Sequence, residues 1–166
     1  MSEAVNIHAS CVRLGRAGAA LGSPAEAGVL LIGKSGAGKS DLALRLIAMG
    51  AALVADDRTD LFVWRNRLHA RAPARLSGLI EVRGVGILKL RTAARVRIAL
   101  VVELGQESAR LPEPRRYRPP PALKLPAKWV PPLVRIAPFE ASAAAKIIAA
   151  TAAWERNLHR HTFNPI

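Results

Sequence analysis

The fold is decided by the sequence GVLLIGKSGAGKS at residues 28–40 of this 166-residue chain. Residues 28–32 form a continuous apolar run of strand length, which is typical of a strand buried on both faces. Residues 33–40 match the phosphate-binding pattern G-x-x-x-x-G-K-[ST] at every fixed position. Over residues 40–49 the apolar side chains recur on one face of a predicted helix, and Gly50 follows, where a helix commonly ends. An ordinary glycine-rich turn is the alternative, but strand, loop and helix is the order that a phosphate-binding loop (P-loop) requires.

The residue types of this loop fit the chemistry of phosphate binding. Gly36 and Gly38 have no Cβ, so the backbone around them can turn its N–H groups inward around phosphate oxygens. The helix that follows presents unpaired N–H groups and the positive end of its dipole to the anion. Lys39 is expected to reach the β- and γ-phosphates, and the Ser40 hydroxyl to ligate Mg²⁺. The residues of the predicted phosphate-binding loop are Gly33, Lys34, Ser35, Gly36, Ala37, Gly38, Lys39 and Ser40.

Composition excludes several protein classes. The chain has 25 Lys and Arg against 12 Asp and Glu, and its hydrophobic fraction of 51% is too high for a disordered basic tail. No apolar run approaches the ~18 residues that a membrane helix needs, and the N-terminal residues lack the apolar region of a signal peptide. The single cysteine, Cys11, excludes an internal disulfide framework and fits a reducing compartment. We therefore expect a cytoplasmic protein without a membrane partner.

The formal net charge of +13 has two interpretations. A strongly basic domain commonly binds nucleic acid. Most of the cations are arginine, however, and alanine and proline are also abundant, as GC-rich coding would produce. The aromatic fraction of 4% supplies few side chains for base stacking. The compositional interpretation is therefore favoured over nucleic-acid binding.

Further apolar segments alternate with turn residues along the chain. Residues 61–64 and 68–71 flank Arg65-Asn66-Arg67, which predicts a β-hairpin. Residues 79–90 predict a second pair of strands around the glycines at 84 and 86. The remaining predictions are strands at 5–14, 53–55 and 96–102, a loop at 15–27 and a helix at 141–155.

Residues 111–138 carry most of the prolines of the chain. Because proline lacks a backbone N–H, this region predicts an extended segment that wraps the surface, and neither a regular helix nor a central strand. No internal repeat or linker divides the chain. Residues 1–166 are therefore predicted to form a single domain that contains the P-loop and is of the α/β or α+β class.

Two acidic segments are candidates for metal binding and proton transfer. Asp56 and Asp57 end the strand after the P-loop helix, and ligands of α/β sheets bind beyond the carboxyl ends of strands. We expect this strand to neighbour the P-loop strand, with one carboxylate facing the metal and the other the acceptor. A solvated strand end or a helix cap is the alternative. Glu81 is a candidate for completing Mg²⁺ coordination and Arg83 for neutralising a transferring phosphoryl group, although this segment also fits a common hairpin.

Four features occur together: His8 on a strand before the P-loop strand, the loop at 33–40, the run LVADD at 53–57 and the run LIEVRGVGI at 79–87. Together they resemble the catalytic domain of HPr kinase/phosphorylase. That family phosphorylates a serine of the phosphocarrier protein HPr, and many members also remove the phosphate by phosphorolysis. The resemblance covers residues 5–155. It implies a P-loop α/β fold related to phosphoenolpyruvate carboxykinase, ATP and Mg²⁺ as cofactors, an HPr-like partner and a homo-oligomer, commonly a hexamer.

The resemblance also implies a role for each matching residue. Asp57 is favoured as the proton acceptor, and Asp56 as a support to the metal or to the geometry. The family's arginine after the strand at 96–102 is matched best by Arg110, with Arg115 and Arg116 as alternatives. The implied catalytic residues are His8, Lys39, Asp56, Asp57, Arg83 and Arg110, and the implied metal ligands are Ser40, Asp56 and Glu81.

The chain departs from the family pattern in two places. The arginine- and glycine-containing segment linked to phosphorolysis has no clear counterpart at residues 135–140, so the kinase reaction is better supported than its reversal. The chain also starts directly at the catalytic part, so we expect a short form without the N-terminal regulatory domain. Two other functions are compatible with the P-loop: a kinase of a small molecule, and a non-catalytic, nucleotide-responsive regulator whose arginine surface contacts nucleic acid or a sensor protein.

Overall fold

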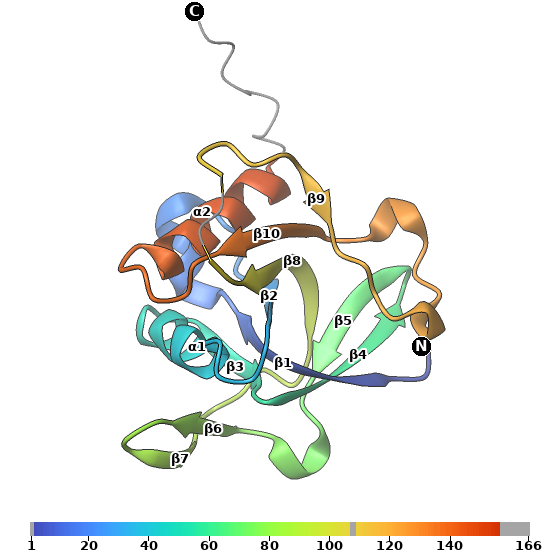
Figure 1. Cartoon of the computed structure of the whole chain (residues 1–166). Coiled ribbons are helices and arrows are strands. Elements are labelled where there is room, and N and C mark those ends of the chain that lie inside the picture. The colour runs from blue at the N-terminus through green and yellow to red at the C-terminus, as the bar shows by residue number, and fades with distance from the viewer. Residues whose placement is uncertain (1, 107–108, 157–166) are drawn as a thin grey trace, which may run out of the picture.

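The structure is a computed structural model that describes residues 2–106 and 109–156 (Figure 1). The predicted strands and helices are confirmed, with bounds that differ by up to three residues. The strands are β1 (Val5–Arg13), β2 (Ala27–Ile32), β3 (Ala52–Ala55), β4 (Arg58–Trp64), β5 (Arg67–Arg71), β6 (Leu79–Val82), β7 (Gly86–Lys89), β8 (Val96–Leu104), β9 (Arg115–Arg116) and β10 (Pro132–Ile136). The helices are α1 (Lys39–Ala48) and α2 (Ala143–Glu155), with short 3₁₀ helices at Gly15–Leu21, Ala74–Leu76, Pro121–Leu123 and Ala127–Trp129.

Strand β2 leads directly into the P-loop and is covered on both faces. Val29 and Leu31 pack into one apolar cluster and Leu30 packs into another, and all three side chains are buried. Successive side chains of a strand point to opposite faces, so a run without polar residues satisfies both clusters. The prediction of a strand buried on both faces is confirmed.

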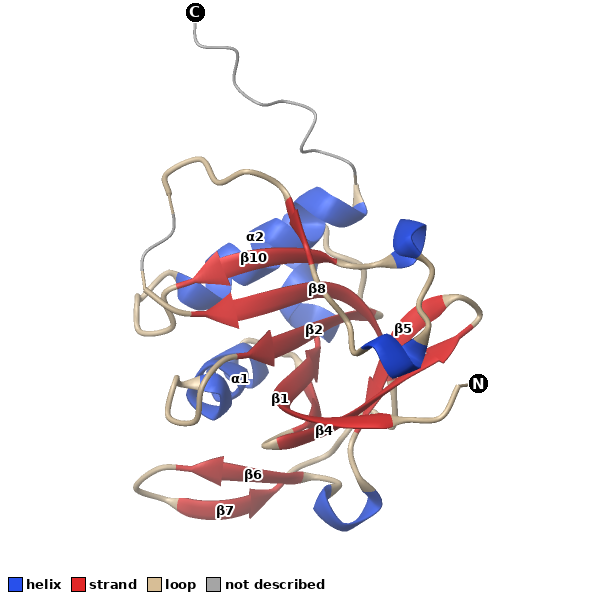
Figure 2. Cartoon of the chain, turned by 45° about the vertical axis from the view of Figure 1, so that its right-hand side comes forward, coloured by secondary structure: helices blue, strands red, loops and turns tan. Residues whose placement is uncertain are grey.

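Eight of the strands form one sheet whose pairings close into a ring. Strands β2, β1, β4, β5 and β8 pair in that order, and β8 pairs back with β2 in parallel. Strand β3 pairs with β1 beside β4, while β10 lies parallel to β8 and carries β9 on its outer edge. Across the middle of the sheet the strands therefore follow the order β3, β1, β2, β8, β10, of which Figure 2 shows β1, β2, β8 and β10.

Two apolar clusters lie on opposite faces of β2 and β8. Helices α1 and α2 bury Leu42, Leu46 and Ile147 against one face, where they meet Leu100 of β8. The other cluster contains Leu30, Leu61, Leu68, Ile98 and Val101, from strands of the ring. Because β2 and β8 contribute to both clusters, the two cores belong to one folded unit. No helix in the described ranges is long and apolar enough to cross a membrane.

Both predicted hairpins are confirmed. Strands β4 and β5 are joined by Arg65 and Asn66, whose φ angles of 49° and 59° fit the two-residue turn that follows the twist of a hairpin. Within the described residues, strands β6 and β7 pair only with each other and form a separate two-stranded sheet. This second hairpin extends beside α1, below it in Figure 1.

The proline-rich region differs from the expectation of a purely extended surface segment. Strand β10 lies inside the sheet, between β8 and β9, and its Leu133 and Ile136 are buried. The strand is possible because Pro132 stands at its first position, and residues 133–136, which retain their backbone N–H groups, pair with β8 in parallel. The predicted loop at 15–27 likewise contains a 3₁₀ helix, Gly15–Leu21, after which the Ser23 hydroxyl donates a hydrogen bond to the Ile148 carbonyl of α2 (3.0 Å).

Leu100 tests the importance of the shared core. Its side chain is fully buried at the centre of β8, so Leu100→Ala is expected to lower the free energy of unfolding by about 2–5 kcal/mol. Urea denaturation measures this value. Leu111→Ala is the matched control, because Leu111 is 74% exposed and its loss should change stability by less than ~0.5 kcal/mol. Equal effects of the two substitutions would contradict the assignment of the core.

Candidate active site

A cavity of about 310 Å³ opens where the P-loop, the turn after β3 and the β6–β7 hairpin meet. Its volume is within the range of small-molecule sites. The groups around it come from segments far apart in the sequence, which the sheet order brings to one edge. The cavity is lined by His8, Ser35, Gly36, Gly38, Lys39, Ser40, Asp41, Leu44, Asp57, Glu81, Val82, Arg83 and Phe139.

Two glycines shape the P-loop for different reasons. Gly36 has φ +77°, and no atom lies within 4 Å of the position that a Cβ would occupy, so backbone conformation alone requires glycine there. Gly38 has φ +91° and is the N-cap of α1, and a Cβ at this position would lie 3.1 Å from ring carbons of Phe139. The loop therefore turns into the first N–H groups of α1, which is the geometry that binds phosphate.

Lys39 lies inside the loop and is almost completely buried. Its Nζ donates hydrogen bonds to the carbonyl oxygens of Gly33 (2.9 Å) and Lys34 (2.8 Å). Burial lowers the pKa of the Lys39 ammonium below its usual value, and the carboxylates of Asp57 and Asp56 oppose part of this shift. Because desolvation disfavours the charged ammonium, a bound anion at the same place would stabilise it.

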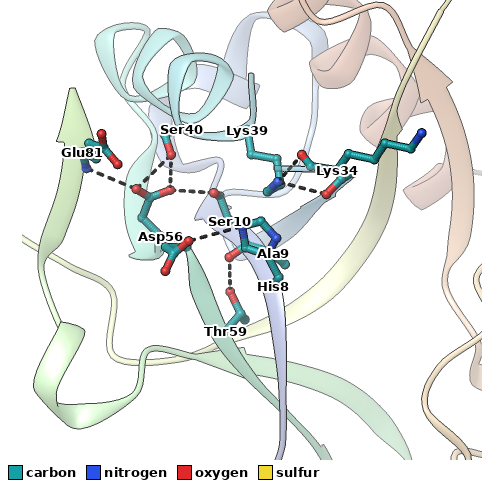
Figure 3. Close-up of polar contacts among 11 residues, drawn as sticks. His8, Ala9, Ser10, Lys34, Lys39, Ser40, Asp56, Thr59 and Glu81 are labelled. Carbon is teal, nitrogen blue, oxygen red and sulfur yellow. Dashed lines mark hydrogen bonds and ion pairs between the residues drawn. The ribbon is translucent and has the colours of Figure 1, made fainter. Parts of the chain in front are cut away.

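Asp56 is buried and accepts hydrogen bonds from three different elements (Figure 3). The Ser10 hydroxyl of β1 donates at 2.6 Å and the Ser40 hydroxyl of α1 at 2.8 Å. The backbone N–H of Glu81, on β6, donates at 3.2 Å. A single carboxylate thus connects β1, the P-loop helix and the β6–β7 hairpin.

Asp57, in contrast, is exposed and points toward His8. The Nε2 atom of His8 is 3.2 Å from Oδ1 of Asp57. The backbone of Asp57 has φ +61°, a left-handed conformation that aspartate tolerates better than most residues. This turn, with the Ala9 N–H donating to the Asp57 carbonyl at 3.2 Å, separates the two carboxylates. Asp56 faces Ser40, and Asp57 faces the open cavity.

The expected neighbourhood of the Asp pair is wrong in one respect. Strand β3 does not lie next to the P-loop strand β2, because β1 pairs antiparallel with both and separates them. The intervening strand contributes His8 and Ser10, which are two residues apart and therefore lie on the same face, so that both reach the Asp pair. The two carboxylates diverge because of the left-handed turn at Asp57, where we had expected the simple alternation of a strand.

The residues around Ser40 fit a magnesium ion that arrives with a nucleotide. Within the described residues, no group of three or more His, Cys, Asp or Glu side chains is placed to hold a metal ion. Mg²⁺ commonly takes only one or two carboxylates and completes its shell with water and phosphate oxygens. The Ser40 hydroxyl beside Asp56, with Glu81 on the cavity wall, is a donor set of that kind.

Not every predicted site residue reaches the cavity. Arg83 lines it, but Arg110 lies in the exposed segment after β8 and is absent from the described residues around the cavity. Of its two alternatives, Arg115 is 3.5 Å from Glu103 and Arg116 donates to the Val130 carbonyl. Gly33 and Lys34 contribute carbonyl groups to Lys39, and Ala37 packs against the core.

Two residues of the site were missed in the sequence. Ser10 could have been found from His8, because residues two apart on a strand share a face. Phe139 gives no such local signal, since it follows the proline-rich region and is far from the P-loop in sequence.

Comparison with known proteins identifies the family. Residues 18–116 match the family model described as the HPr Serine kinase C-terminal domain. The chain belongs to this family. The matched range contains the P-loop, the Asp pair and the β6–β7 hairpin, whereas His8 and Phe139 lie outside it.

Relatives agree with this assignment. The HPr kinase/phosphorylase of Variovorax paradoxus is 47% identical over 85 residues, which cover 46% of this chain and 27% of the relative. That of Leptothrix cholodnii is 49% identical over 85 residues, covering 46% of this chain and 26% of the relative. The matched part therefore spans about a quarter of the length of these relatives.

A solved structure supports the fold of the family. The Hpr(Ser) kinase/phosphatase from Coxiella burnetii superposes with a TM-score of 0.67 at 21% sequence identity. The superposition covers 95% of this chain and 99% of that chain. The mixed α/β fold with a central sheet is thus the fold of the family's kinase domain, as the resemblance implied.

Ser10 tests the network around Asp56. Ser10→Ala removes a hydrogen bond to a buried carboxylate and is expected to lower the free energy of unfolding by about 1.5–3 kcal/mol. Urea denaturation of the ligand-free protein provides the measurement. In the control Ser142→Ala the serine is exposed and makes no side-chain capping bond, so the change should stay below ~0.5 kcal/mol. A Ser10→Ala variant as stable as the control would show that Asp56 does not depend on this bond.

Proposed function

We propose that the protein transfers the γ-phosphoryl group of ATP to a serine of an HPr-like phosphocarrier protein. The observation that carries the proposal is the pair formed by Asp57 and His8 at the mouth of a cavity that also contains the P-loop lysine. An exposed carboxylate beside a phosphate site is placed to accept a proton from an incoming hydroxyl group. Family membership supports the same conclusion.

The proposed reaction assigns a step to each of these groups. The acceptor serine Oγ bonds to the γ-phosphorus, and its proton passes to the Asp57 carboxylate. The bond between the γ-phosphorus and the β,γ-bridging oxygen breaks, and ADP leaves with that oxygen. His8 holds the carboxylate of Asp57 in place, while Lys39 and Arg83 neutralise charge on the transferring group. Mg²⁺, which Ser40, Asp56 and Glu81 would hold with the nucleotide, supplies further neutralisation of the phosphate oxygens.

Apolar surface beside the cavity favours a protein acceptor over a small molecule. Val85 and Ile87, on the β6–β7 hairpin that also carries Glu81 and Arg83, are 70% and 72% exposed. Neighbouring exposed aliphatic side chains are typical of surfaces that contact another protein. A small-molecule acceptor bound inside the cavity would not contact these two side chains, since neither lines it.

Further predictions from the sequence concern the domain organisation, the reverse reaction, the location, the oligomeric state and Arg110. Strands β2 and β8 belong to both apolar clusters, which supports the proposal that the described residues act as one catalytic domain. Phosphorolysis, the cytoplasmic location, the homo-oligomer and a role for Arg110 stay predictions from the sequence.

Lys39 and Asp57 test the proposed chemistry. With ATP, Mg²⁺ and a purified HPr protein, Lys39→Ala and Asp57→Asn are each expected to lower the rate of transfer by about 100-fold or more. Mass spectrometry of the intact acceptor measures the transferred phosphate. Lys89→Ala and Glu113→Gln are matched controls on exposed residues outside the cavity and should retain the rate.

The outcomes separate the candidate functions. Unchanged transfer in both variants would exclude the assigned roles. Labelling of metabolites without labelling of protein would favour the small-molecule kinase, and nucleotide binding without turnover would favour the regulator.

The hairpin surface gives a separate test of the acceptor class. The double substitution Val85→Ser and Ile87→Ser is expected to raise the KM for the HPr protein about tenfold, because it removes exposed apolar surface at the cavity rim. The Kd for Mg²⁺-ATP should not change, since neither side chain lines the cavity. An unaltered KM would argue against docking of a protein on this hairpin.

A further inference from the structure

Phe139 is an exposed aromatic ring at the edge of the cavity. It is 74% exposed, although a phenylalanine ring gains from burial. Single exposed apolar residues are ordinary, so exposure alone has no meaning. Among the described residues, however, Phe139 lines the cavity, and the other strongly exposed large apolar side chains do not. These others are Leu21, Met49, Val85, Ile87 and Leu111.

The ring lies directly against the P-loop. Its Cε1 and Cζ atoms are 3.1 Å from the position that a Cβ of Gly38 would occupy. Gly38 is the last glycine of the loop and the N-cap of α1. One part of the ring thus touches the phosphate loop, and the rest faces solvent and the cavity.

The backbone on both sides of Phe139 is held in place by α1. The Arg45 guanidinium donates hydrogen bonds to the carbonyl oxygens of Pro138 and, at 3.2 Å, of Glu140. Its Nε also donates to Asp41 at 3.1 Å, and the Glu140 carboxylate pairs with Lys146 of α2. These bonds fix the segment that carries the ring, so the ring is presented by an ordered turn.

The order of strands places Phe139 opposite the phosphoryl-acceptor groups. In the series β3, β1, β2, β8, β10, the P-loop follows the middle strand, β2. Asp57 and His8 belong to the β3 and β1 side of the P-loop, and Phe139 follows β10 on the other side. Figure 2 shows β10, β8, β2 and β1 in succession from top to bottom. A nucleotide whose γ-phosphate faces Asp57 must extend its other end away from β1, toward the loop after β10.

We propose that Phe139 is the platform on which the base of the bound nucleotide stacks. This inference rests on the proposed function, because it requires a nucleoside triphosphate in the P-loop. A flat ring held beside the phosphate site offers its π-face to any nucleobase, since base–aromatic stacking tolerates all bases. The platform strengthens binding of nucleoside triphosphates relative to inorganic polyphosphates, and it discriminates little between purines.

The test compares a ligand that has a base with one that has none. The Kd values of Mg²⁺-ATP and of Mg²⁺-tripolyphosphate are measured by calorimetry for the whole chain and for Phe139→Ala. Loss of the ring is expected to weaken ATP binding roughly tenfold and to leave tripolyphosphate binding within about twofold. Phe139→Trp should retain ATP binding, and GTP should follow ATP in every variant. Leu111→Ala, which removes an equally exposed side chain outside the cavity, should change neither Kd.

The results distinguish failure of the platform from failure of the proposed function. Equal effects of Phe139→Ala on ATP and tripolyphosphate, or no effect on either, would overturn the stacking role while leaving the P-loop function in place. Unchanged ATP binding with slower transfer to the HPr protein would also overturn it, by assigning the ring to the acceptor. Failure of the wild-type chain to bind either ligand would overturn the proposed function and the platform together. Lys39→Ala, which should bind neither ligand, is the reference for that outcome.

Discussion

The site depends on one buried carboxylate. Asp56 accepts hydrogen bonds from Ser10, Ser40 and the Glu81 backbone, and so joins a strand of the ring, the P-loop helix and the separate β6–β7 hairpin. A buried carboxylate must be satisfied by donors, because leaving it without partners would cost several kcal/mol. The requirement to satisfy Asp56 therefore determines where the hairpin lies and which way Ser40 points. This network connects the phosphate loop to the cavity wall.

Asp56 and Asp57 are adjacent in the chain but have different roles, because one side chain is buried and the other is exposed. Asp56 is enclosed and orders the surrounding elements, whereas Asp57 is exposed and faces the cavity with His8. The left-handed turn at Asp57 produces this division over a single peptide unit. Lys39 completes the electrostatic arrangement, since its ammonium is buried near both carboxylates and lies on the loop where an anion is expected.

Much of the site could be predicted from the sequence, which indicated the types of residue involved but not their arrangement in space. The P-loop, the acidic pair and the Glu81–Arg83 segment stand out because their chemistry is concentrated in short stretches. Ser10 has no chemical motif of its own, and only its spacing of two residues from His8 marks it. Phe139 was overlooked because it is far from the P-loop in sequence. Arg110 was selected by its position in the chain, and it is not among the described residues that line the cavity. The error over β10 has a similar origin, since Pro132 obscured the apolar strand that follows it.

The sequence by itself determined the local elements: the buried strand β2, the glycine conformations of the P-loop, the helix that follows and both hairpins. Their determinants are contiguous, because backbone conformation and the periodicity of apolar residues act over a few positions. Only the tertiary structure decided that β1 separates β2 from β3, that β8 closes the ring, and that Phe139 lies across the P-loop from Asp57. Strand order depends on how entire faces are buried against one another, and that burial is a property of the assembled chain rather than of any segment.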